Sequence, residues 1–565
     1  MRAGRCHALP RPHDVAALVG AFLSTIALIG LLQALDPPVR IQAQQLVPVS
    51  PAAGTHAIAG RFAAMPAPQP ATAAVITTPQ ALSPAQSAVS ALDFDRLSST
   101  WAGRRAGAII ADPAAGPVPG TEVAPLPVAA PSDGGALARL VQHVAVLVPS
   151  AFGLAVRMVA EPSVAVGDSV VWLTGNWFAA RSTDAGASWT YVNPYSDFPT
   201  FASDQDTVYD PQRHLFLWYR QGGMVPGRLE NSFRLNASSD GAASWCGFTV
   251  RPSDVDPSWN VFSFDYPHLA LSGNYLYVSS MLLVTGSGFA SPRMLLLRMP
   301  LDDLAACAAF RYVYWTSDEG WSWTPVENGA TTAMYLGDTL DPGGTERTGT
   351  FRLYVQPEAT TTLSYVDRSV PAWTYTERSA LCTVSGGGNP CARTDQRITS
   401  GWVRDRDGGA EIGFLWNVRE GGGFPNPYIN AATFDAATLQ VTGRPMLWDT
   451  RCAWQYGATS PNGPDLGIAA FYFCASQPPA HAVGFADNAD GPARWSMFYS
   501  RVGEVPTSTL VWGDYIRLRA DARGYVATGF TIGAAGAEPF LVSFARRPVL
   551  APEPDFGYDP RGPGR

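Results

Sequence analysis

A repeat of short, aromatic-rich strands limits the fold of this chain more than any other feature of its sequence. Seven segments open alike, with an acidic, threonine or glycine turn that is followed by an apolar strand and then by a second, aromatic strand. The openings are spaced 45 to 69 residues apart, near Glu161, Asp206, Asp265, Thr331, Ser400, Tyr456 and Trp512. A four-stranded blade with its loops needs about 40–50 residues. The spacing therefore predicts an all-β β-propeller of seven blades, or of six if one opening is spurious.

The predicted propeller covers residues 137–547. Runs such as HLFLWYRQGG (214–223) and NYLYVSSMLLV (274–284) alternate with clusters of Gly, Asp, Asn and Pro. This alternation is typical of short strands joined by hairpin turns. Helical periodicity is limited to one predicted turn at Pro300–Ala309.

An eight-residue motif, S/T-x-D-x-G-x-S/T-W, recurs in this region. It is complete at 182–189 (STDAGASW) and 316–323 (TSDEGWSW), and 238–245 (SSDGAASW) differs only in where its glycine stands. The aspartate can accept hydrogen bonds within a turn, the glycine can adopt positive φ, and the tryptophan can pack on the sheet, which favours a hairpin between the outer strands of a blade. The match at 316–323 lies close to the next blade opening and is either such a hairpin or a coincidence. The expected structural residues are Ser182, Asp184, Gly186, Trp189, Asp240, Trp245, Asp318, Gly320 and Trp323.

These motifs, called Asp-boxes, and the blade-like spacing resemble the sialidase-like (bacterial neuraminidase repeat) propeller superfamily. The resemblance covers residues 155–547, and the segment VWGDY (511–515) is similar to the final blades of secreted members. In that superfamily the boxes lie on the outer rim and build the fold, so the resemblance implies an architecture and leaves the activity open.

The catalytic pattern of the family's sialidases is not found in the sequence. Those enzymes carry an R-I/L-P motif in the first blade, two further arginines that complete a carboxylate clamp, a Tyr–Glu nucleophile pair and an aspartic acid. Between residue 155 and the first box, this chain has only Arg157 and Arg181, and neither opens an R-I-P or R-L-P motif. Glu327 with Tyr335 could supply a Tyr–Glu pair, or could be a solvated glutamate and a core tyrosine. The leading hypothesis is therefore a non-catalytic module that binds a glycan, a cell-wall polymer or a protein. The alternatives are an exo-acting glycoside hydrolase of sialidase type and a purely structural surface protein.

Blade openings and early strands are expected to place side chains in the central channel of a propeller. The candidate ligand-binding residues are Arg157, Arg220, His268, Tyr335, Arg404 and Asp514. Arg378 and Arg517 are further arginines that could join an anion clamp, and His268 is either a ligand or base or a hydrogen-bonded structural residue. No G-x-S-x-G, H-E-x-x-H or phosphate-loop motif occurs. We expect no metal centre and no cofactor, except that Asp405–Glu411 could be a structural calcium loop or an ordinary hairpin.

The charge of the chain excludes several functions. All 39 basic residues are arginine, so chemistry that needs a lysine, such as a Schiff base or a P-loop, is ruled out. The net charge of −8 argues against nucleic acid as a partner. Any anion clamp in this protein must be built from guanidinium groups.

The N-terminal region is expected to direct the chain out of the cytoplasm. Arg2, Arg5 and Arg11 precede an uncharged apolar run at 15–35, which is either a cleaved signal peptide or a retained membrane anchor within segment 1–43. Residues 44–136 are rich in Ala and Pro and are predicted to form a disordered linker, and 548–565 a disordered tail. The protein is therefore expected to be secreted or anchored to a membrane.

The cysteines fit a location outside the cytoplasm. The globular region has six: Cys246, Cys307, Cys382, Cys391, Cys452 and Cys474. Six cysteines allow fifteen pairings, of which pairing between sequence neighbours is the simplest. It would close the glycine-rich loop 382–391 and tie 452 to 474 within one blade.

Overall fold

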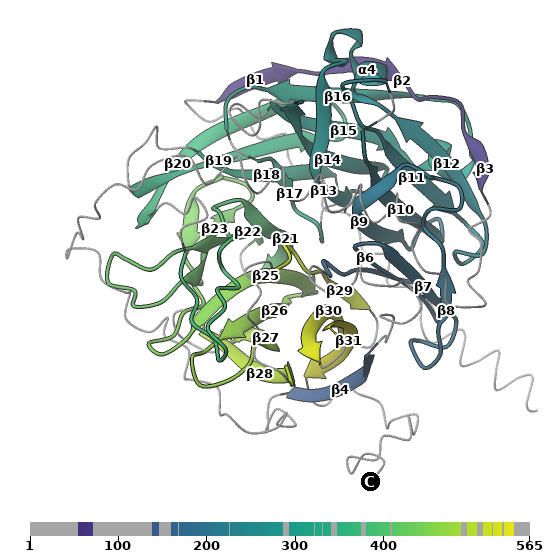
Figure 1. Cartoon of the computed structure of the whole chain (residues 1–565). Helices are drawn as coiled ribbons and strands as arrows, with labels where there is room; N and C mark the ends of the chain where they lie inside the picture. Colours follow the sequence, from purple (N-terminus) through teal and green to yellow (C-terminus); the bar gives the residue numbers. More distant parts are fainter. Residues whose placement is uncertain are drawn as a thin grey trace, which may run out of the picture. The chain divides into compact units, whose positions relative to one another are not determined.

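A computed structural model describes residues 55–71, the backbone of 138–145, and 160–546 with short internal gaps. Seven antiparallel sheets are arranged in a ring (Figure 1). The innermost strands of successive sheets contact one another in cyclic order, and the last of them contacts the first. The seven-bladed all-β propeller predicted from the sequence is confirmed.

Each blade is a meander that starts at the centre of the ring and ends at its rim. The first blade contains β5 (Ser163–Gly167), β6 (Val170–Gly175), β7 (Phe178–Ser182) and β8 (Thr190–Val192). The second contains β9 (Phe201–Asp210), β10 (Leu215–Gly222), β11 (Phe233–Ser238) and β12 (Trp245–Val250). The third contains β13 (Phe262–Leu271), β14 (Tyr275–Val284), β15 (Arg293–Pro300) and β16 (Arg311–Ser317). Short helices α4 (Pro252–Val255), η2 (Pro257–Trp259) and α5 (Leu301–Ala305) lie in the connections, α5 at the predicted helical turn.

The remaining blades follow the same plan. They contain β17 (Thr324–Pro325), β18 (Ala333–Thr339), β19 (Arg347–Pro357) and β20 (Thr362–Thr374); β21 (Ile398–Arg406), β22 (Gly409–Val418), β23 (Tyr428–Asp435) and β24 (Val441–Gly443); β25 (Ala453–Asn462), β26 (Asp465–Phe473), β27 (Ala480–Asp487) and β28 (Arg494–Val502); β29 (Leu518–Asp521), β30 (Gly524–Gly533) and β31 (Gly536–Arg546).

The ring is closed by a strand from the N-terminal side of the propeller. β4 (Ala138–Ala145) pairs antiparallel with β31 and supplies the outermost strand of the seventh blade. Because the two strands lie about 400 residues apart in sequence, this pairing joins the beginning and the end of the propeller.

Three blades carry a fifth strand at the rim, which the sequence did not predict. β1 (His56–Ala59) pairs with β20, β2 (Arg61–Ala64) with β16, and β3 (Gln69–Ala71) with β12. We call residues 55–71 the strap, because they run along the rim from the fourth blade through the third to the second (Figure 1). For these residues the structure differs from the disordered linker expected at 44–136. The backbone groups of an edge strand accept any extended segment, so a sequence rich in Ala and Pro can pair without a strand-like side-chain pattern.

Two of the three Asp-box matches form hairpins at the rim. The box at 182–189 joins β7 to β8, and the box at 238–245 joins β11 to β12. In the first, the Asp184 carboxylate accepts hydrogen bonds from the Ser182 hydroxyl at 2.7 Å and the Ser188 amide at 2.8 Å. Asp240 accepts the equivalent bonds from the Ser238 hydroxyl and the Ser244 amide. Positive φ falls on the same two positions in both turns, although the glycine occupies only one of them in each.

The match at 316–323 does not have this geometry. It lies between β16, in the third blade, and β17, the first strand of the fourth blade, rather than within a hairpin. Asp318 pairs with Arg293 at 2.6 Å, and the amide of Ser322 donates instead to Asp338. Gly320 and the buried Trp323 therefore belong to a connection between two blades.

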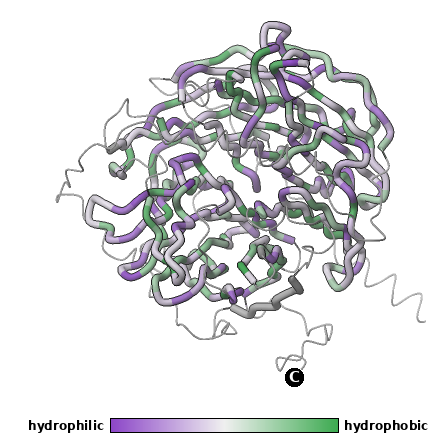
Figure 2. Tube along the Cα trace, viewed as in Figure 1, coloured by the Kyte–Doolittle hydropathy of each residue, from purple (hydrophilic) through white to green (hydrophobic). Residues whose placement is uncertain are grey.

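The core lies between the faces of neighbouring blades. Hydrophobic residues follow the strands, whereas hydrophilic residues are more frequent in the loops (Figure 2). Trp172 and Trp218, from the first and second blades, pack on each other with ring centroids 4.9 Å apart. Trp245, from the second Asp-box, completes this group at 4.8 Å from Trp172. The box tryptophan therefore seals the contact between two blades.

All three disulfides join sequence neighbours, as predicted. Cys246–Cys307 connects the rim of the second blade to the connection after α5, Cys382–Cys391 closes a loop before β21, and Cys452–Cys474 lies within the sixth blade. Three disulfides in one domain are typical of proteins that fold outside the cytoplasm. The apolar run at 15–35 and the tail at 548–565 lie outside the described residues. No helix within the described ranges has the length and apolar character needed to span a bilayer.

Candidate functional site

Four carboxylates from four segments gather where the innermost strands begin. Glu161 precedes β5, Asp204 lies in β9, Asp265 in β13, and Asp514 precedes β29. We call these four residues the carboxylate cluster. Glu161 is 3% exposed, whereas the other three are half-buried. Solvent or a ligand can therefore reach the cluster.

Glu161 is held by neighbours on both sides of its carboxyl group. Oε1 accepts a hydrogen bond from the amide of Asp514 at 2.8 Å, and Oε2 accepts one from the Asn176 side chain at 2.7 Å. The backbone of Glu161 has φ of 39°, in the left-handed region that a residue with a Cβ seldom adopts. Strain of this kind is found mostly where function requires a particular side-chain direction.

A β-bulge turns Asp265 toward the same place. The pairing of β13 with β14 shifts between Asp265 and His268, and the intervening Tyr266 has φ of 53°. The Gln221 amide donates to Asp265 Oδ1 at 3.3 Å. The Tyr266 hydroxyl donates to the carbonyl of Ile398 at 3.2 Å, which links the third blade to the fifth.

Two arginines pair with Asp514. Arg397 Nη2 lies 3.2 Å and Arg393 Nη2 lies 3.5 Å from Asp514 Oδ2. Arg397 also binds Asp395 at 2.8 Å, and its guanidinium stacks over Tyr266 at 3.9 Å. Asp514 is therefore the member of the cluster that has direct cationic partners among the described residues.

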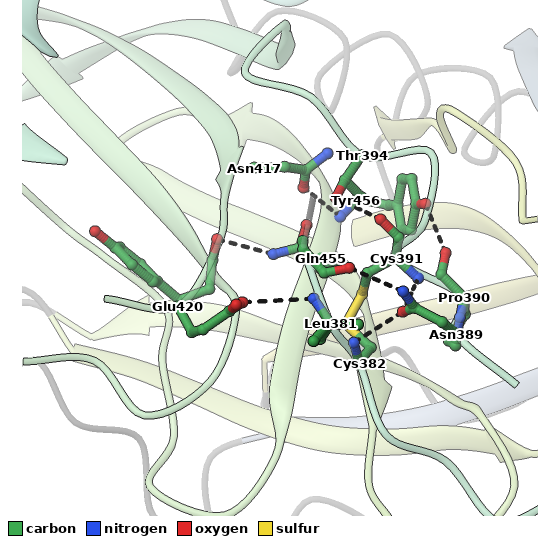
Figure 3. Close-up of a disulfide and its surroundings, with 12 residues drawn as sticks. Leu381, Cys382, Asn389, Pro390, Cys391, Thr394, Asn417, Glu420, Gln455 and Tyr456 are labelled. Carbon is green, nitrogen blue, oxygen red and sulfur yellow. Dashed lines mark hydrogen bonds between the residues drawn. A yellow bond between two sulfur atoms is a disulfide. The ribbon is translucent and has the colours of Figure 1, made fainter. Parts of the chain in front are cut away.

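The Cys382–Cys391 loop positions these arginines. The Asn389 side chain accepts from the amide of Cys382 at 2.8 Å and donates to the carbonyl of Ala380, which closes the loop on itself (Figure 3). The Tyr456 hydroxyl donates to the carbonyl of Pro390 at 2.9 Å (Figure 3). Because Arg393 follows Cys391 by only two residues, the disulfide and Tyr456 fix the segment that carries it.

The environment raises the pKa of three carboxyl groups. Burial, together with the nearby charge of Asp514, raises the pKa of Glu161 to about 7. Burial and the charge of Glu161 raise the pKa of Asp204 well above its usual value. Burial also raises the pKa of Asp265, although Arg397 opposes the shift. Because its pKa is about 7, Glu161 can both donate and accept a proton near neutral pH, as acid–base catalysis requires.

Buried polar atoms beside the cluster have no hydrogen-bond partner among the described residues. They are Asn176 Oδ1, Gln221 Oε1 and the Tyr219 hydroxyl. Asn176 and Tyr219 are fully buried and Gln221 is 8% exposed. Asn176 and Gln221 already contact the cluster through their amide nitrogens, so their free oxygens are available next to it. Such atoms are costly to bury unpaired, and a ligand at the cluster would satisfy them.

A buried ion network fills the channel next to the cluster. Asp206, two residues after Asp204 on the same face of β9, pairs with Arg517 at 3.1 Å. Arg517 also lies 3.3 Å from Glu327, whose carboxylate accepts a hydrogen bond from His268 Nδ1 at 2.9 Å. The pKa of Asp206 falls to about 2 because Arg517 and Arg519 outweigh the effect of burial. Asn328 donates to the carbonyls of Thr459 and Leu518, so the segment after β17 crosses the channel to the sixth and seventh blades.

The predicted ligand-binding residues fall into different environments. Asp514 lies in the carboxylate cluster, and His268 lies in the ion network, where burial lowers its pKa. Tyr335 is part of the hydrophobic core, and Glu327 is buried rather than solvated. Arg157 and Arg378 lie outside the described residues.

The described candidate arginines do not converge. Arg220 forms a two-pronged pair with Asp197 and stacks on Trp218. Arg404 pairs with Glu411 at 2.6 Å, and Arg517 pairs with Asp206. Each therefore has its own carboxylate, in contrast to the shared clamp expected of a sialidase site.

No group of three or more His, Cys, Asp or Glu in the described part of the chain is arranged to hold a metal ion. In the candidate calcium loop, Glu411 pairs with Arg404 and Arg406, while 407–408 lie outside the described residues.

The sequence indicated part of this site. Glu161 and Asp265 were recognised as blade openings, and Asp204 lies two residues before the opening at Asp206, but none of the three was predicted as a site residue. The shared signal is an acidic residue at the start of an inner strand. Arg393 and Arg397 were missed because they lie in an inserted loop outside the repeat.

Comparison with models of known protein families found no match, and neither did comparison with curated protein sequences. Among solved structures, the chain is similar to a GH43 β-1,3-galactosidase with galactodeoxynojirimycin, at 9% identity and a TM-score of 0.29, over 52% of this chain and 95% of that one. It is also similar to a Trypanosoma rangeli sialidase in complex with sialic acid, at 10% identity and a TM-score of 0.30, over 60% of this chain and 53% of the sialidase. A third is an α-L-arabinofuranosidase from Fusarium graminearum in complex with an iminosugar inhibitor, at 9% identity and a TM-score of 0.32, over 68% of this chain and 92% of that one. The match thus spans about half the length of the Trypanosoma enzyme. Seven blades and two rim Asp-boxes give this chain the architecture of a sialidase-like propeller.

Proposed function

We propose that the protein acts on a glycan outside the cytoplasm and that the carboxylate cluster is its active site, where a glycosidic bond is hydrolysed. The observation that carries the proposal is the pairing of Glu161 with Asp514. Glu161 has a pKa of about 7, which suits a general acid, and Asp514 lies beside two arginines, which favour its ionised form. Two carboxyl groups in these different states are what glycoside hydrolysis requires.

In this mechanism, Glu161 donates its proton to the oxygen of the leaving sugar. Asp514 stabilises positive charge at the sugar's anomeric carbon, either by attacking that carbon or by activating a water molecule. Asn176 and the amide of Asp514 keep the Glu161 carboxyl in place. The nucleophile or base is then a carboxylate, in contrast to the tyrosine expected of a sialidase-type enzyme.

Binding without turnover is the second candidate, and one observation favours it. Both oxygens of Glu161 already accept hydrogen bonds from the protein, as they would if this side chain only shaped a binding surface. The binding module would then hold a glycan or wall polymer through the same residues. A membrane anchor at 15–35 would place either kind of protein at a cell surface.

A panel of fluorogenic glycosides tests the proposal. It should include galactoside, arabinofuranoside, glucosaminide and sialoside, assayed between pH 5 and pH 8 and combined with glycan-array binding. We expect turnover of at least one glycoside other than the sialoside, and a loss of about 10²–10⁴-fold in Glu161→Gln. Asp405→Asn is the control. It removes an exposed carboxylate near the C-terminal end of β21, whereas Arg397 precedes the N-terminal end of that strand, and it should leave turnover unchanged.

The panel separates the alternatives. Glycan binding without turnover of any glycoside would favour the binding module, and turnover of the sialoside alone would favour a sialidase-type enzyme. A protein that neither binds nor cleaves glycans would be a structural surface protein.

A further inference from the structure

The carboxylate cluster has two electrostatically different halves. Asp514 pairs with Arg393 and Arg397. In the other half, the hydrogen-bond partners of Glu161 and Asp265 are the neutral side chains of Asn176 and Gln221 and a backbone amide. We call Glu161, Asp204 and Asp265 the acidic half. No direct ion pair to these three residues is found among the described residues.

Neutral acceptors extend the acidic half. Gln221 is 8% exposed, its Nε2 donates to Asp265, and its Oε1 has no partner among the described residues. Asn176 repeats this arrangement at Glu161, where Nδ2 donates and Oδ1 has no partner in the described chain. Two buried amide oxygens without a partner among the described residues therefore lie beside the carboxyl oxygens of this half, and all of these atoms can accept hydrogen bonds.

A cationic donor fits this surface better than a neutral or anionic one. A sugar hydroxyl can satisfy one acceptor, but it brings no charge to offset crowded carboxylates. The carboxylate of a sialic or uronic acid would be repelled by them. An ammonium group offers three donors and a positive charge at one point. The pKa of Asp204 is raised by burial and by the charges of Glu161 and Asp265, as expected for a carboxyl group without a counter-charge, whereas at Asp265 the charge of Arg397 opposes the effect of burial.

We infer that the acidic half receives the ammonium group of an amino sugar, so that the glycan contains hexosamine units with free amino groups. This inference rests on the proposed function, because it names the sugar class that the same site selects. Asp204 and Asp265 are half-buried and therefore accessible to the ammonium group, while Glu161 is 3% exposed and contacts the amide of Asp514. The amino group would thus be held beside the residues proposed to act on the glycosidic bond.

Three matched tetrasaccharides test the inference by calorimetry on the full chain. They are the β-1,4-linked tetramers of glucosamine, N-acetylglucosamine and glucose, which differ only at one substituent of each ring. We expect the glucosamine tetramer to bind at least about tenfold more tightly than the other two, which corresponds to about 1.4 kcal/mol. Added salt should reduce this preference, because it screens charges.

Variants locate the preference within the site. The double variant Asp204→Asn with Asp265→Asn should bind the three tetramers with similar affinity, whereas Asp405→Asn should keep the preference for glucosamine. The single variant Asp265→Asn, which should reduce the preference in part, replaces the double variant if thermal melting shows that the latter does not fold.

The outcomes separate the inference from the proposed function. Equal or tighter binding of the acetylated or glucose tetramer would overturn the inference and leave a glycan-acting protein. A preference that survives in the Asp204 and Asp265 variants would also overturn it. If no tetramer binds and no glycoside in the panel above is bound or cleaved, the proposed function fails as well.

Discussion

The backbone amide of Asp514 donates a hydrogen bond of 2.8 Å to the carboxylate of Glu161, across 353 positions of sequence. Glu161 stands at the entrance to the first blade and Asp514 at the entrance to the seventh. The candidate site is therefore built at the seam where the ring closes. Its geometry depends on the same packing that joins the first blade to the last.

Gly513→Ala should disturb this contact directly. A Cβ at position 513 would lie 2.8 Å from Glu161 Cγ, which is closer than packed carbon atoms tolerate. We expect the turnover of a cleaved glycoside to fall and the alkaline limb of its pH profile to move, since Glu161, which must be protonated to act as the acid, would lose its position against Asp514. Steady-state kinetics between pH 5 and pH 8 measures both effects. An unchanged profile would mean that Glu161 is not the acid.

The stability of the protein should depend on pH through Glu161. Its pKa is about 7 in the folded protein against 4.5 ordinarily, so between these values the folded state retains a proton that the unfolded state releases. This contribution is fully present below about pH 4.5 and is lost as the pH rises to about 7. Relative to Glu161→Gln, the wild type should lose up to about 3 kcal/mol of unfolding free energy across that window. Urea unfolding at several pH values measures the difference, and a difference that does not vary with pH would contradict the assignment.

The Asp-box matches should differ in their contribution to stability. Asp184→Ala removes hydrogen bonds to the Ser182 hydroxyl and the Ser188 amide, and should lower the unfolding free energy by about 1 kcal/mol. Asp318→Ala breaks the ion pair with Arg293, the contact of this aspartate among the described residues; because Asp318 is 73% exposed, the change should be less than about 0.5 kcal/mol. Urea midpoints compare the two variants. Equal losses would show that the match at 316–323 stabilises the protein as much as the box at 182–189, despite its position between blades.

The disulfides Cys382–Cys391 and Cys452–Cys474 should be separable by function. Replacing either Cys382 and Cys391, or Cys452 and Cys474, by alanine should cost about 3 kcal/mol of stability, because the loops span 9 and 22 residues. Only the first pair holds the segment that carries Arg393. We therefore expect glycan affinity or turnover to fall with Cys382→Ala/Cys391→Ala and to persist with Cys452→Ala/Cys474→Ala. Similar activities in both, measured well below their melting temperatures, would argue against a positioning role for the loop.

Arg517 should be essential for the fold. Its guanidinium is fully buried between Asp206 and Glu327, so Arg517→Ala would leave two buried carboxylates without their main counter-charge. The expected loss is about 3–5 kcal/mol. Arg406→Ala, which removes an arginine 39% exposed beside Glu411, should change stability by less than about 1 kcal/mol. Thermal melting of the two variants measures the difference in stability. A small loss of stability in Arg517→Ala would mean that the ion network rearranges or takes up water.

The blade pattern was readable from the sequence because it is a local property. Six of the seven inner strands begin within about six residues of a predicted opening, as at Glu161 for β5 and Ser400 for β21, whereas the opening predicted at Thr331 follows β17 and precedes β18. Strand periodicity, turn residues and cysteine spacing are all encoded by neighbours in sequence. Seven blades and three neighbour disulfides could therefore be predicted without a structure.

The site could be predicted only in part, since it depends on contacts between distant blades. Asp514 was selected as a candidate, but nothing near it in sequence indicates Glu161 as its partner. His268 and Arg517 were expected near the central channel, as a ligand or structural residue and as part of an anion clamp, but their burial in one ion network follows from the closure of the ring. The strap was not predicted because its pairing uses backbone groups and leaves no side-chain pattern.

The strap also has a mechanical consequence. Its strands β1, β2 and β3 contain only four, four and three residues, and they attach in series to three different blades. A pulling force on the chain before Thr55 would reach β1 first, then β2, then β3, and would detach them one after another. Each short strand would detach at low force and so lengthen the free chain, while the blades keep their own four-stranded pairing. The strap would thus act as a set of sacrificial bonds, which protects the ring and its seam from load applied at the N-terminal side.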